Sequence, residues 1–424
     1  MVSILATGLM LAVFDIGEHF AEKDSWDESA TDFAVEHIGD GFNFVSQKRD
    51  VVNCMKRGKV SWLGCDVWET RIYYNNGAGA KRIEMSLYNR GDASPGDHFL
   101  SGDLEILKRA IQKSFAKDEK EPKDVKTKLK SRGLRYERCW PTADPAVELS
   151  WGVGSDGSIQ FVKVTLTPKQ KMRPKGATKA ISGQNAAAKV KANVKKNGEG
   201  DVWIDGVPMV DQGQKGYCAA AVSERLLRYY GHDIDEHEIA QQAGSQAQGG
   251  TRVSDMIETI RAIGVKKRLG FNQIVSMAGS FGEIEKEIES YNKTAKSMKE
   301  DEISLASHMH GNMVSVNELY DEMKPKVLKK MRTKDSRYKK FLSGVKTQVD
   351  KGIPICWGVT LGIFPEPGLN IQGRGGHMRL IIGYNAKTGE VLYTDTWGAG
   401  HELKRIPEDW AFAITHDAFF LRPL

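Results

Sequence analysis

The strongest constraint in this sequence is a cysteine that stands where a glycine-rich turn gives way to a helix-forming run. Residues 211–223 read D-Q-G-Q-K-G-Y-C-A-A-A-V-S. The three alanines after Cys218 are strong helix formers, and an apolar face at helical spacing continues from them to a stop at Gly231. The sequence therefore predicts that Cys218 begins a helix, where unpaired backbone N–H groups and the helix dipole favour a thiolate.

Gln212 lies six residues before this cysteine. Gly213 and Gly216 allow the loop between them to fold back toward the sulfur. The side-chain amide of Gln212 and the backbone N–H of Cys218 would then form an oxyanion hole, a pair of donors that stabilises a tetrahedral intermediate. A simpler interpretation of the same loop is that Cys218 is an inert buried side chain, as many free cysteines are.

A histidine and an acid are predicted to meet at one edge of a sheet near the C-terminus. His377 opens an apolar strand that runs to residue 384, and Asp395 follows a second strand over residues 391–393. Neighbouring antiparallel strands place the start of one beside the end of the other, so the carboxylate would lie next to the imidazole. Such a pair takes the proton of a thiol and later donates one to a leaving amine, while the acid fixes the tautomer of the ring.

These motifs resemble those of papain-like cysteine peptidases. The run Q-G-x-x-G-x-C-A from Gln212 to Ala219 resembles the nucleophile signature Q-G-x-C-G-x-C-W of that family. The strand G-H-x-x-x-x-I-G-Y resembles its histidine strand, and D-T-W-G from Asp395 resembles its N-S-W-G motif. The resemblance is closer to the peptidase C39-like branch than to papain itself.

Several departures from the papain pattern are visible, among them Gln214 in place of the polar residue before the extra cysteine. Lys215 replaces the extra cysteine of the signature, so the disulfide near the papain site is absent, and Asp395 replaces the usual asparagine. Both departures fit the C39-like branch. His377 follows Cys218 by 159 residues, more than the roughly 130–150 of papain-type enzymes, and a charged helical insertion over residues 281–350 accounts for the excess.

The resemblance covers about residues 201–424 and implies an α+β fold. In the implied papain-like domain, the helix that carries the nucleophile packs on an antiparallel sheet. The implied function is that of a cysteine peptidase that hydrolyses peptide bonds in peptide or protein substrates without a cofactor. The implied nucleophile, base, acid and oxyanion donor are Cys218, His377, Asp395 and Gln212.

The same residues leave other functions open. Acyl transfer to an amine, or cleavage of an isopeptide bond, uses the same chemistry with a different acceptor. A further possibility, from another class, is a peptide-binding module with a vestigial site, in which the N-terminal part of the chain performs the main task.

Upstream of the peptidase-like domain the sequence predicts a smaller α+β domain. An amphipathic helix over residues 100–115 is flanked by two strand pairs, and the first pair turns at the N-N-G-A-G run. The paired strands are 62–74 with 82–88 and 146–153 with 159–166. The predicted parts are an apolar segment or secretion signal, the α+β domain, a basic flexible linker and the peptidase-like domain: residues 1–23, 24–168, 169–200 and 201–424.

The distribution of charge along the chain bears on whether the protein binds nucleic acid. The net charge of the whole chain is +6, whereas residues 169–199 alone hold nine basic residues and one acid, a net charge of +8. Because few large apolar side chains occur there, this stretch predicts a solvated linker, or a place where a pro-region is released by processing. No aromatic residue is interleaved with its basic residues, so nucleic-acid binding is not expected.

The cysteines and the N-terminus complete the sequence predictions. None of the five cysteines forms a C-x-x-C pair, so no metal site is predicted. Cys356 lies in an apolar run typical of a buried strand, and like Cys54, Cys65 and Cys139 it is free or bridged. The apolar N-terminal segment is too short to span a membrane as a helix. It is either a secretion signal, which favours a secreted or periplasmic location, or a buried first helix of the N-terminal domain.

Overall fold

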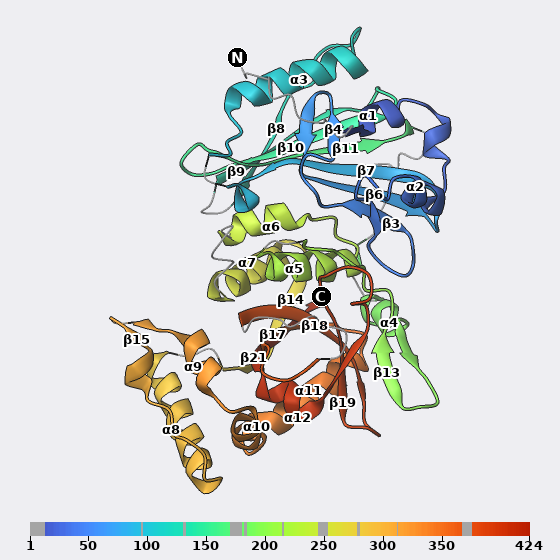
Figure 1. The fold of residues 1–424 in the computed structure, drawn as a ribbon. Helices are drawn as coiled ribbons and strands as arrows, with labels where there is room; N and C mark the ends of the chain where they lie inside the picture. The colour runs from blue at the N-terminus through green and yellow to red at the C-terminus, as the bar shows by residue number, and fades with distance from the viewer. Residues whose placement is uncertain are drawn as a thin grey trace.

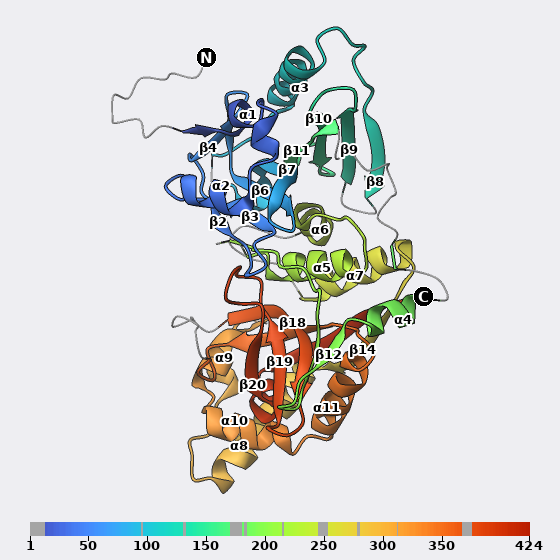
Figure 2. The same cartoon turned by 90° about the vertical axis from the view of Figure 1, so that its right-hand side faces the viewer.

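The computed structural model describes residues 13–94, 96–129, 133–169, 180–181, 185–213, 216–244, 253–277, 280–311, 313–366 and 375–424. Within these ranges the buried hydrophobic side chains form two cores, one between Ile16 and Leu166 and one between Val190 and Leu421. We call the two parts the N-terminal unit and the C-terminal unit. Figures 1 and 2 show helices α5 (Cys218–Tyr229) and α6 (Glu236–Ala243) lying between the large sheets of the two units.

The N-terminal unit is built on an eight-stranded sheet in the order β2-β3-β6-β7-β11-β10-β9-β8. Helix α3 (Ser101–Phe115) packs against β10. Strands β6 and β7 form the predicted hairpin, and its turn residues Asn76 and Gly77 have φ angles of 51° and 81°, the left-handed conformation that Asn-Gly adopts easily. The strands are β2 (Asn43–Phe44), β3 (Val51–Cys54), β6 (Glu69–Asn75), β7 (Ala78–Asn89), β8 (Val125–Leu129), β9 (Gly133–Trp140), β10 (Ala146–Val153) and β11 (Ile159–Thr167).

Two strand predictions need correction. The single strand predicted over residues 62–74 is wrong, because Leu63 and Gly64 have φ angles of 49° and 75° and turn the chain back on itself. Strands β4 (Val60–Trp62) and β5 (Cys65–Val67) pair across this turn, and β6 follows them. The sequence also does not predict β8 and β9, because their lysines and arginines interrupt the apolar pattern. Lysines of this kind are common in an edge strand such as β8.

Residues 14–20 belong to the segment predicted as an apolar N-terminal region or secretion signal. They form β1 (Phe14–Asp15) and α1 (Ile16–His19), and Ile16 and Phe20 are buried in the N-terminal core. Residues 1–12 of the same segment lie outside the described residues. The remaining short elements of this unit are η1 (Asp24–Trp26), α2 (Ala30–Glu36) and η2 (Arg90–Asp92).

The C-terminal unit contains a sheet in the order β12-β13-β18-β17-β21-β14, to which β19 and β20 are added beside β18. Figures 1 and 2 show α5 and α7 (Val253–Lys266) on one side of this sheet. On the other side lie α10 (Pro325–Thr333), α11 (Ser336–Val349) and α12 (Glu408–Ala413). Because helices cover both faces, β17 is buried along its whole length. The strands are β12 (Val194–Lys196), β13 (Asp201–Ile204), β14 (Leu269–Ser276), β17 (Ile355–Leu361), β18 (Gly375–Asn385), β19 (Glu390–Thr394), β20 (Lys404–Pro407) and β21 (Thr415–Pro423).

The segment over residues 281–350, predicted to be a charged helical insertion, is mainly helical. It also contains the short 3-10 helix η5 (Leu305–His308) and a pair of two-residue strands. Among the helices in the described ranges, none is both long and apolar enough to cross a membrane. The elements are α8 (Phe281–Ser297), β15 (Met309–His310), β16 (Met313–Val314), α9 (Val316–Glu322), α10 (Pro325–Thr333) and α11 (Ser336–Val349), and α12 (Glu408–Ala413) precedes the last strand.

Part of the segment predicted to be a flexible linker forms regular secondary structure. Helix α4 (Ala186–Lys191) and strand β12 lie within residues 169–200. Val190 is buried in the C-terminal core, and β12 pairs with β13 at the edge of the sheet. Because these residues bury an apolar side chain and form sheet hydrogen bonds, the prediction of a flexible linker is wrong for residues 186–196.

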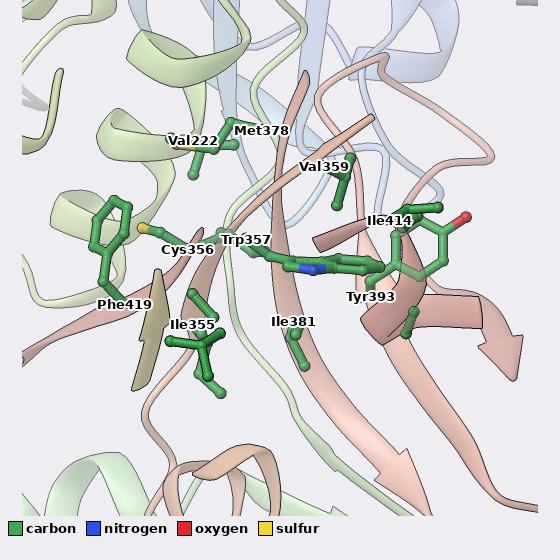
Figure 3. Close-up of a cluster of buried hydrophobic side chains, with 14 of the residues drawn as sticks. Val222, Ile355, Cys356, Trp357, Val359, Met378, Ile381, Tyr393, Ile414 and Phe419 are labelled. Carbon is green, nitrogen blue, oxygen red and sulfur yellow. The ribbon is translucent and has the colours of Figure 1, made fainter. Parts of the chain in front are cut away.

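The centre of the C-terminal core lies around Trp357 on β17. Figure 3 shows Ile381, Tyr393 and Ile414 near its ring, whereas Phe419 lies beside Cys356 on the other side of the strand. The indole N–H of Trp357 donates a hydrogen bond of 2.8 Å to the hydroxyl of Thr415, so the polar group of this buried ring is satisfied. This packing fixes β17 and β18 side by side beneath helix α5.

We expect Ile381→Ala to lower the free energy of unfolding by about 3 kcal/mol, because it leaves a cavity in this core. Val265→Ala is the matched control. Val265 is 74% exposed on α7 whereas Ile381 is fully buried, so the control should change stability by less than about 0.5 kcal/mol. Urea unfolding of the two variants measures both values, and equal losses would contradict the core assignment.

Candidate active site

Cys218 is the first residue of helix α5, at the position that the sequence predicts. Its side chain is half-buried and forms no disulfide. The backbone N–H groups of Ala219 and Met378 donate hydrogen bonds to the sulfur. Burial opposes ionisation of this thiol, but the charge and hydrogen bond of His377, together with these backbone donors, lower the pKa of Cys218 below its ordinary value.

His377 and Asp395 come together at one edge of the sheet. The antiparallel register pairs Leu380 of β18 with Thr394 of β19, which places the start of β18 beside the residue that follows β19. The His377 Nε2 atom lies 2.5 Å from Asp395 Oδ1. Because Nε2 faces the carboxylate, Nδ1 is the ring nitrogen left for the hydrogen bond that His377 forms with the Cys218 side chain.

The pKa values of His377 and Asp395 are shifted in opposite directions from their ordinary values. Burial alone would lower the pKa of His377, but the charges of Asp395 and Cys218 and their hydrogen bonds raise it to about 9. Burial alone would raise the pKa of Asp395, but His377 and Arg379 hold it well below its usual range. An imidazolium beside an ionised carboxylate is therefore the favoured state near neutral pH, and its charge makes the Cys218 thiol easier to ionise.

Trp397 covers the imidazole. Its ring stacks on the ring of His377 with centroids 4.4 Å apart and an angle of 9° between the planes. The side chains of His377 and Asp395 are 4% and 0% exposed. The stacked indole therefore keeps water from one face of the ring and shields the hydrogen bond between the histidine and the acid.

Gln212 is held by the residue that follows Asp395. Its backbone N–H donates a hydrogen bond of 2.8 Å to the carbonyl of Thr396, and its side-chain Oε1 accepts a hydrogen bond from the Thr396 hydroxyl. The Thr396 N–H in turn donates to Asp395 Oδ1 at 2.9 Å. The structure thus links Gln212 to Asp395 and fixes the orientation of the Gln212 amide.

Two buried arginines support the acid, and the sequence motifs do not reveal them. Arg379 Nε lies 2.8 Å from Asp395 Oδ2. Arg225 donates a hydrogen bond to the backbone carbonyl of Asp395. Alternation along a strand could have identified Arg379, which lies two residues after His377 and so on the same face. Helical spacing could have identified Arg225, since it lies two turns after Cys218 on α5.

The remaining cysteines differ from Cys218. None of the five cysteines, all of which lie within the described residues, forms a disulfide. Cys356 is fully buried in β17, as its apolar surroundings predict. Burial raises the pKa of Cys54, Cys65 and Cys356, so these thiols are poor nucleophiles at neutral pH.

Two groups of side chains among the described residues have the composition of a metal site. In the group of Glu69, Glu236 and His237, the guanidinium of Arg71 pairs with both glutamates and lies 2.7 Å from Glu236. Arg71 thus supplies the positive charge that a metal ion would bring. Neither group includes a residue of the predicted active site. The groups are Glu69 with Glu236 and His237, and Glu137 with Cys139 and Glu148.

Comparison with known proteins identifies the family. The model described as the peptidase C39-like family matches residues 204–415, half of the chain. The solved structure of xylellain, a cysteine protease from Xylella fastidiosa, is 14% identical with a TM-score of 0.29, over 58% of this chain and 92% of that chain. No match is found among curated proteins. Because the family model spans half of its length, the chain belongs to the peptidase C39-like family and is a cysteine-type peptidase.

Proposed function

We propose that this peptidase hydrolyses peptide bonds with Cys218 as the nucleophile, His377 as the base and acid, and Asp395 as the residue that orients the imidazole. One observation carries the proposal. The Cys218 sulfur, at the start of helix α5, is hydrogen-bonded to the His377 imidazole, which is in turn hydrogen-bonded to the Asp395 carboxylate. The packing of α5 against β18 supports a papain-like arrangement, and we assign the activity to residues 201–424.

The geometry supports acylation in the following way. The Cys218 thiolate attacks the carbonyl carbon of the scissile bond, and the carbonyl oxygen becomes an oxyanion. The His377 imidazolium donates its Nδ1 proton to the nitrogen of the leaving amine, and the C–N bond breaks. Cys218 then carries the acyl group as a thioester, and His377 is neutral.

Deacylation reverses these roles. Neutral His377 removes a proton from a water molecule, and the resulting hydroxide attacks the thioester carbon. The tetrahedral intermediate collapses, the C–S bond breaks, and Cys218 leaves as the thiolate beside the imidazolium. The products are a carboxylic acid and an amine, and the site returns to its starting protonation state.

We further propose that Gln212 and the backbone N–H of Cys218 form the oxyanion hole. Thr396 engages the Oε1 atom of Gln212, so the amide NH₂ is directed away from Thr396. A fixed donor is more effective than a mobile one because it needs no reorganisation when the charge develops. The position of Cys218 at the N-terminus of α5 aligns its own N–H with the helix dipole.

Two alternatives use the same residues. Acyl transfer to an amine, or isopeptide cleavage, would follow the same first step and differ in the acceptor or the bond attacked. Product analysis with an added amine separates hydrolysis from transfer. A vestigial peptide-binding site is less well supported, because its cysteine would have no need of the lowered pKa that His377 gives Cys218.

We expect Cys218→Ala to abolish cleavage of a peptide library, with a loss of kcat on the order of 10⁵-fold or more. The library cut by the wild type would also define the substrate preference. Cys65→Ala is the matched control, since Cys65 is also a half-buried free thiol but is absent from the site. Cleavage by folded Cys218→Ala at the wild-type rate would contradict the proposal.

We expect activity to depend on pH through both members of the ion pair. As the pH falls below the lowered pKa of Cys218, the thiolate is protonated and the nucleophile is lost. As the pH rises through about 9, His377 loses the proton that it must give to the leaving amine. The profile of kcat/KM should therefore be bell-shaped, with apparent pKa values that belong to the pair.

Alkylation tests the same ion pair without a substrate. Iodoacetamide at neutral pH should label Cys218 before Cys65, as followed by mass spectrometry, because burial raises the pKa of the Cys65 thiol. His377→Ala should remove this preference. Equal labelling of the two cysteines in the wild type would support the vestigial interpretation instead.

A further inference from the structure

The N-terminal unit holds the loop that leads into the nucleophile. We call residues 211–213 and 216–217 the nucleophile loop. The side-chain amide of Asn53 on β3 donates to the carboxylate of Asp211 at 3.4 Å, and Arg71 on β6 donates to the Asp211 carbonyl at 3.3 Å. Both donors are buried. The sheet of one unit therefore contacts the start of this loop in the other.

The contact nearest to Cys218 along the chain is made by Tyr217, the residue before the proposed nucleophile. Its hydroxyl donates a hydrogen bond of 2.9 Å to the side-chain oxygen of Asn89, at the end of β7. Tyr217 is 1% exposed and Asn89 is 4% exposed. Asn89 is itself fixed, because its oxygen also accepts from the Gly91 N–H and its amide donates to Asp92.

Gly91 shows how closely the two units approach each other here. A Cβ atom at this position would lie 1.5 Å from the hydroxyl oxygen of Tyr217. Any larger residue would displace the tyrosine. The surface of the N-terminal unit is thus complementary in shape to the Tyr217 side chain.

Ion pairs also connect the N-terminal unit to the C-terminal unit. Arg71 pairs with Glu236 of α6 at 2.7 Å, and Lys163 of β11 pairs with Asp235 at 2.6 Å. Together with the buried Tyr217 and Asn89 side chains, these opposite charges match the two surfaces to each other in one arrangement. The two units are therefore expected to stay together during turnover.

The position of Tyr217 gives this contact a consequence for the chemistry. Tyr217 is the N-cap residue of α5, and the peptide bond that follows it carries the backbone N–H of Cys218. A fixed Tyr217 side chain limits rotation of that peptide. The direction of the proposed oxyanion donor is thereby set from outside the C-terminal unit.

We propose that the N-terminal unit is a working part of the active site, in which Asn89 acts through Tyr217 as a positioning residue for the Cys218 N–H. The inference rests on the proposed function above. It differs from the pro-region interpretation, in which the N-terminal unit would block the site until processing released it. Cys218 remains half-buried rather than covered with this unit in place.

The test compares two tyrosines on one helix. Tyr217→Phe removes the hydroxyl that contacts Asn89. Tyr230→Phe, at the other end of α5, removes an equally buried hydroxyl that donates to the Leu421 carbonyl at 2.7 Å. Peptide hydrolysis is measured per active site, with the active fraction counted by alkylation of Cys218.

We expect Tyr217→Phe to lower kcat about 10- to 100-fold with KM within about twofold, because a small misplacement of a catalytic group has an effect of this size. The pH dependence of Cys218 alkylation should not change, since His377 sets it. Tyr230→Phe should keep the wild-type kcat. Asn89→Ala, which removes the acceptor instead of the donor, should reproduce the loss and serves if Tyr217→Phe fails to fold.

Equal kcat for Tyr217→Phe, Asn89→Ala and wild type would overturn the inference. So would an equal loss in both tyrosine variants, which would indicate a general effect on the helix. These results are separable from failure of the proposed function. If Cys218→Ala remained active the nucleophile would be wrong, whereas an inactive Cys218→Ala with unaffected Tyr217→Phe would remove only the role of the N-terminal unit.

Discussion

Keeping the Asp395 carboxylate ionised inside the protein is the constraint on which the rest of the site depends. A charge with no exposed surface is costly unless it is paired and hydrogen-bonded. Here the partners are the His377 ring, the Arg379 guanidinium and the Thr396 N–H. His377 and Arg379 lie two residues apart on β18, and Thr396 directly follows Asp395. The strands β18 and β19 must therefore pair in this register before the ionised carboxylate is stable.

The second constraint is the burial of α5 between two sheets. A helix that is covered on all sides normally lacks charged residues, yet Glu224, Arg225 and Arg228 lie within it. Each has a partner: Arg225 contacts the segment of the acid, while Arg228 and Glu224 pair with each other at 2.8 Å beside Tyr73 of the N-terminal sheet. These charged side chains determine which surfaces the helix contacts, and so they fix the rotation of Cys218 about the helix axis.

Much of the fold and the position of the site could be predicted from the sequence, because those parts depend on local patterns. The start of α5, the hairpin at Asn76 and the order of β18 and β19 follow from helix formers, turn chemistry and apolar runs. Arg225 and Arg379 were not predicted, because a charged residue in an apolar run shows no partner until the fold supplies one. The contact of Tyr217 with Asn89 joins residues 128 positions apart, and no local pattern records such a pair.

The same distinction explains the corrections. Val190 is the only large apolar side chain in helix α4, so sequence composition describes this region as a linker although the sheet edge orders it. The lysines of β8 hide a strand whose backbone pairing is regular. In both places tertiary contacts stabilise secondary structure that the local composition does not favour. The composition indicates only whether a segment can fold alone.

The stacking of Trp397 on His377 restricts where protons can pass. With one face covered by the indole and Nε2 facing Asp395, exchange is confined to Nδ1 on the sulfur side of the ring. In the mechanism proposed above, the departing amine and the incoming water would therefore occupy one shared position in succession. Partition between water and a competing amine is then a matter of which molecule fills that position during the lifetime of the thioester, and a hydrolase and a transferase could share every side chain described here.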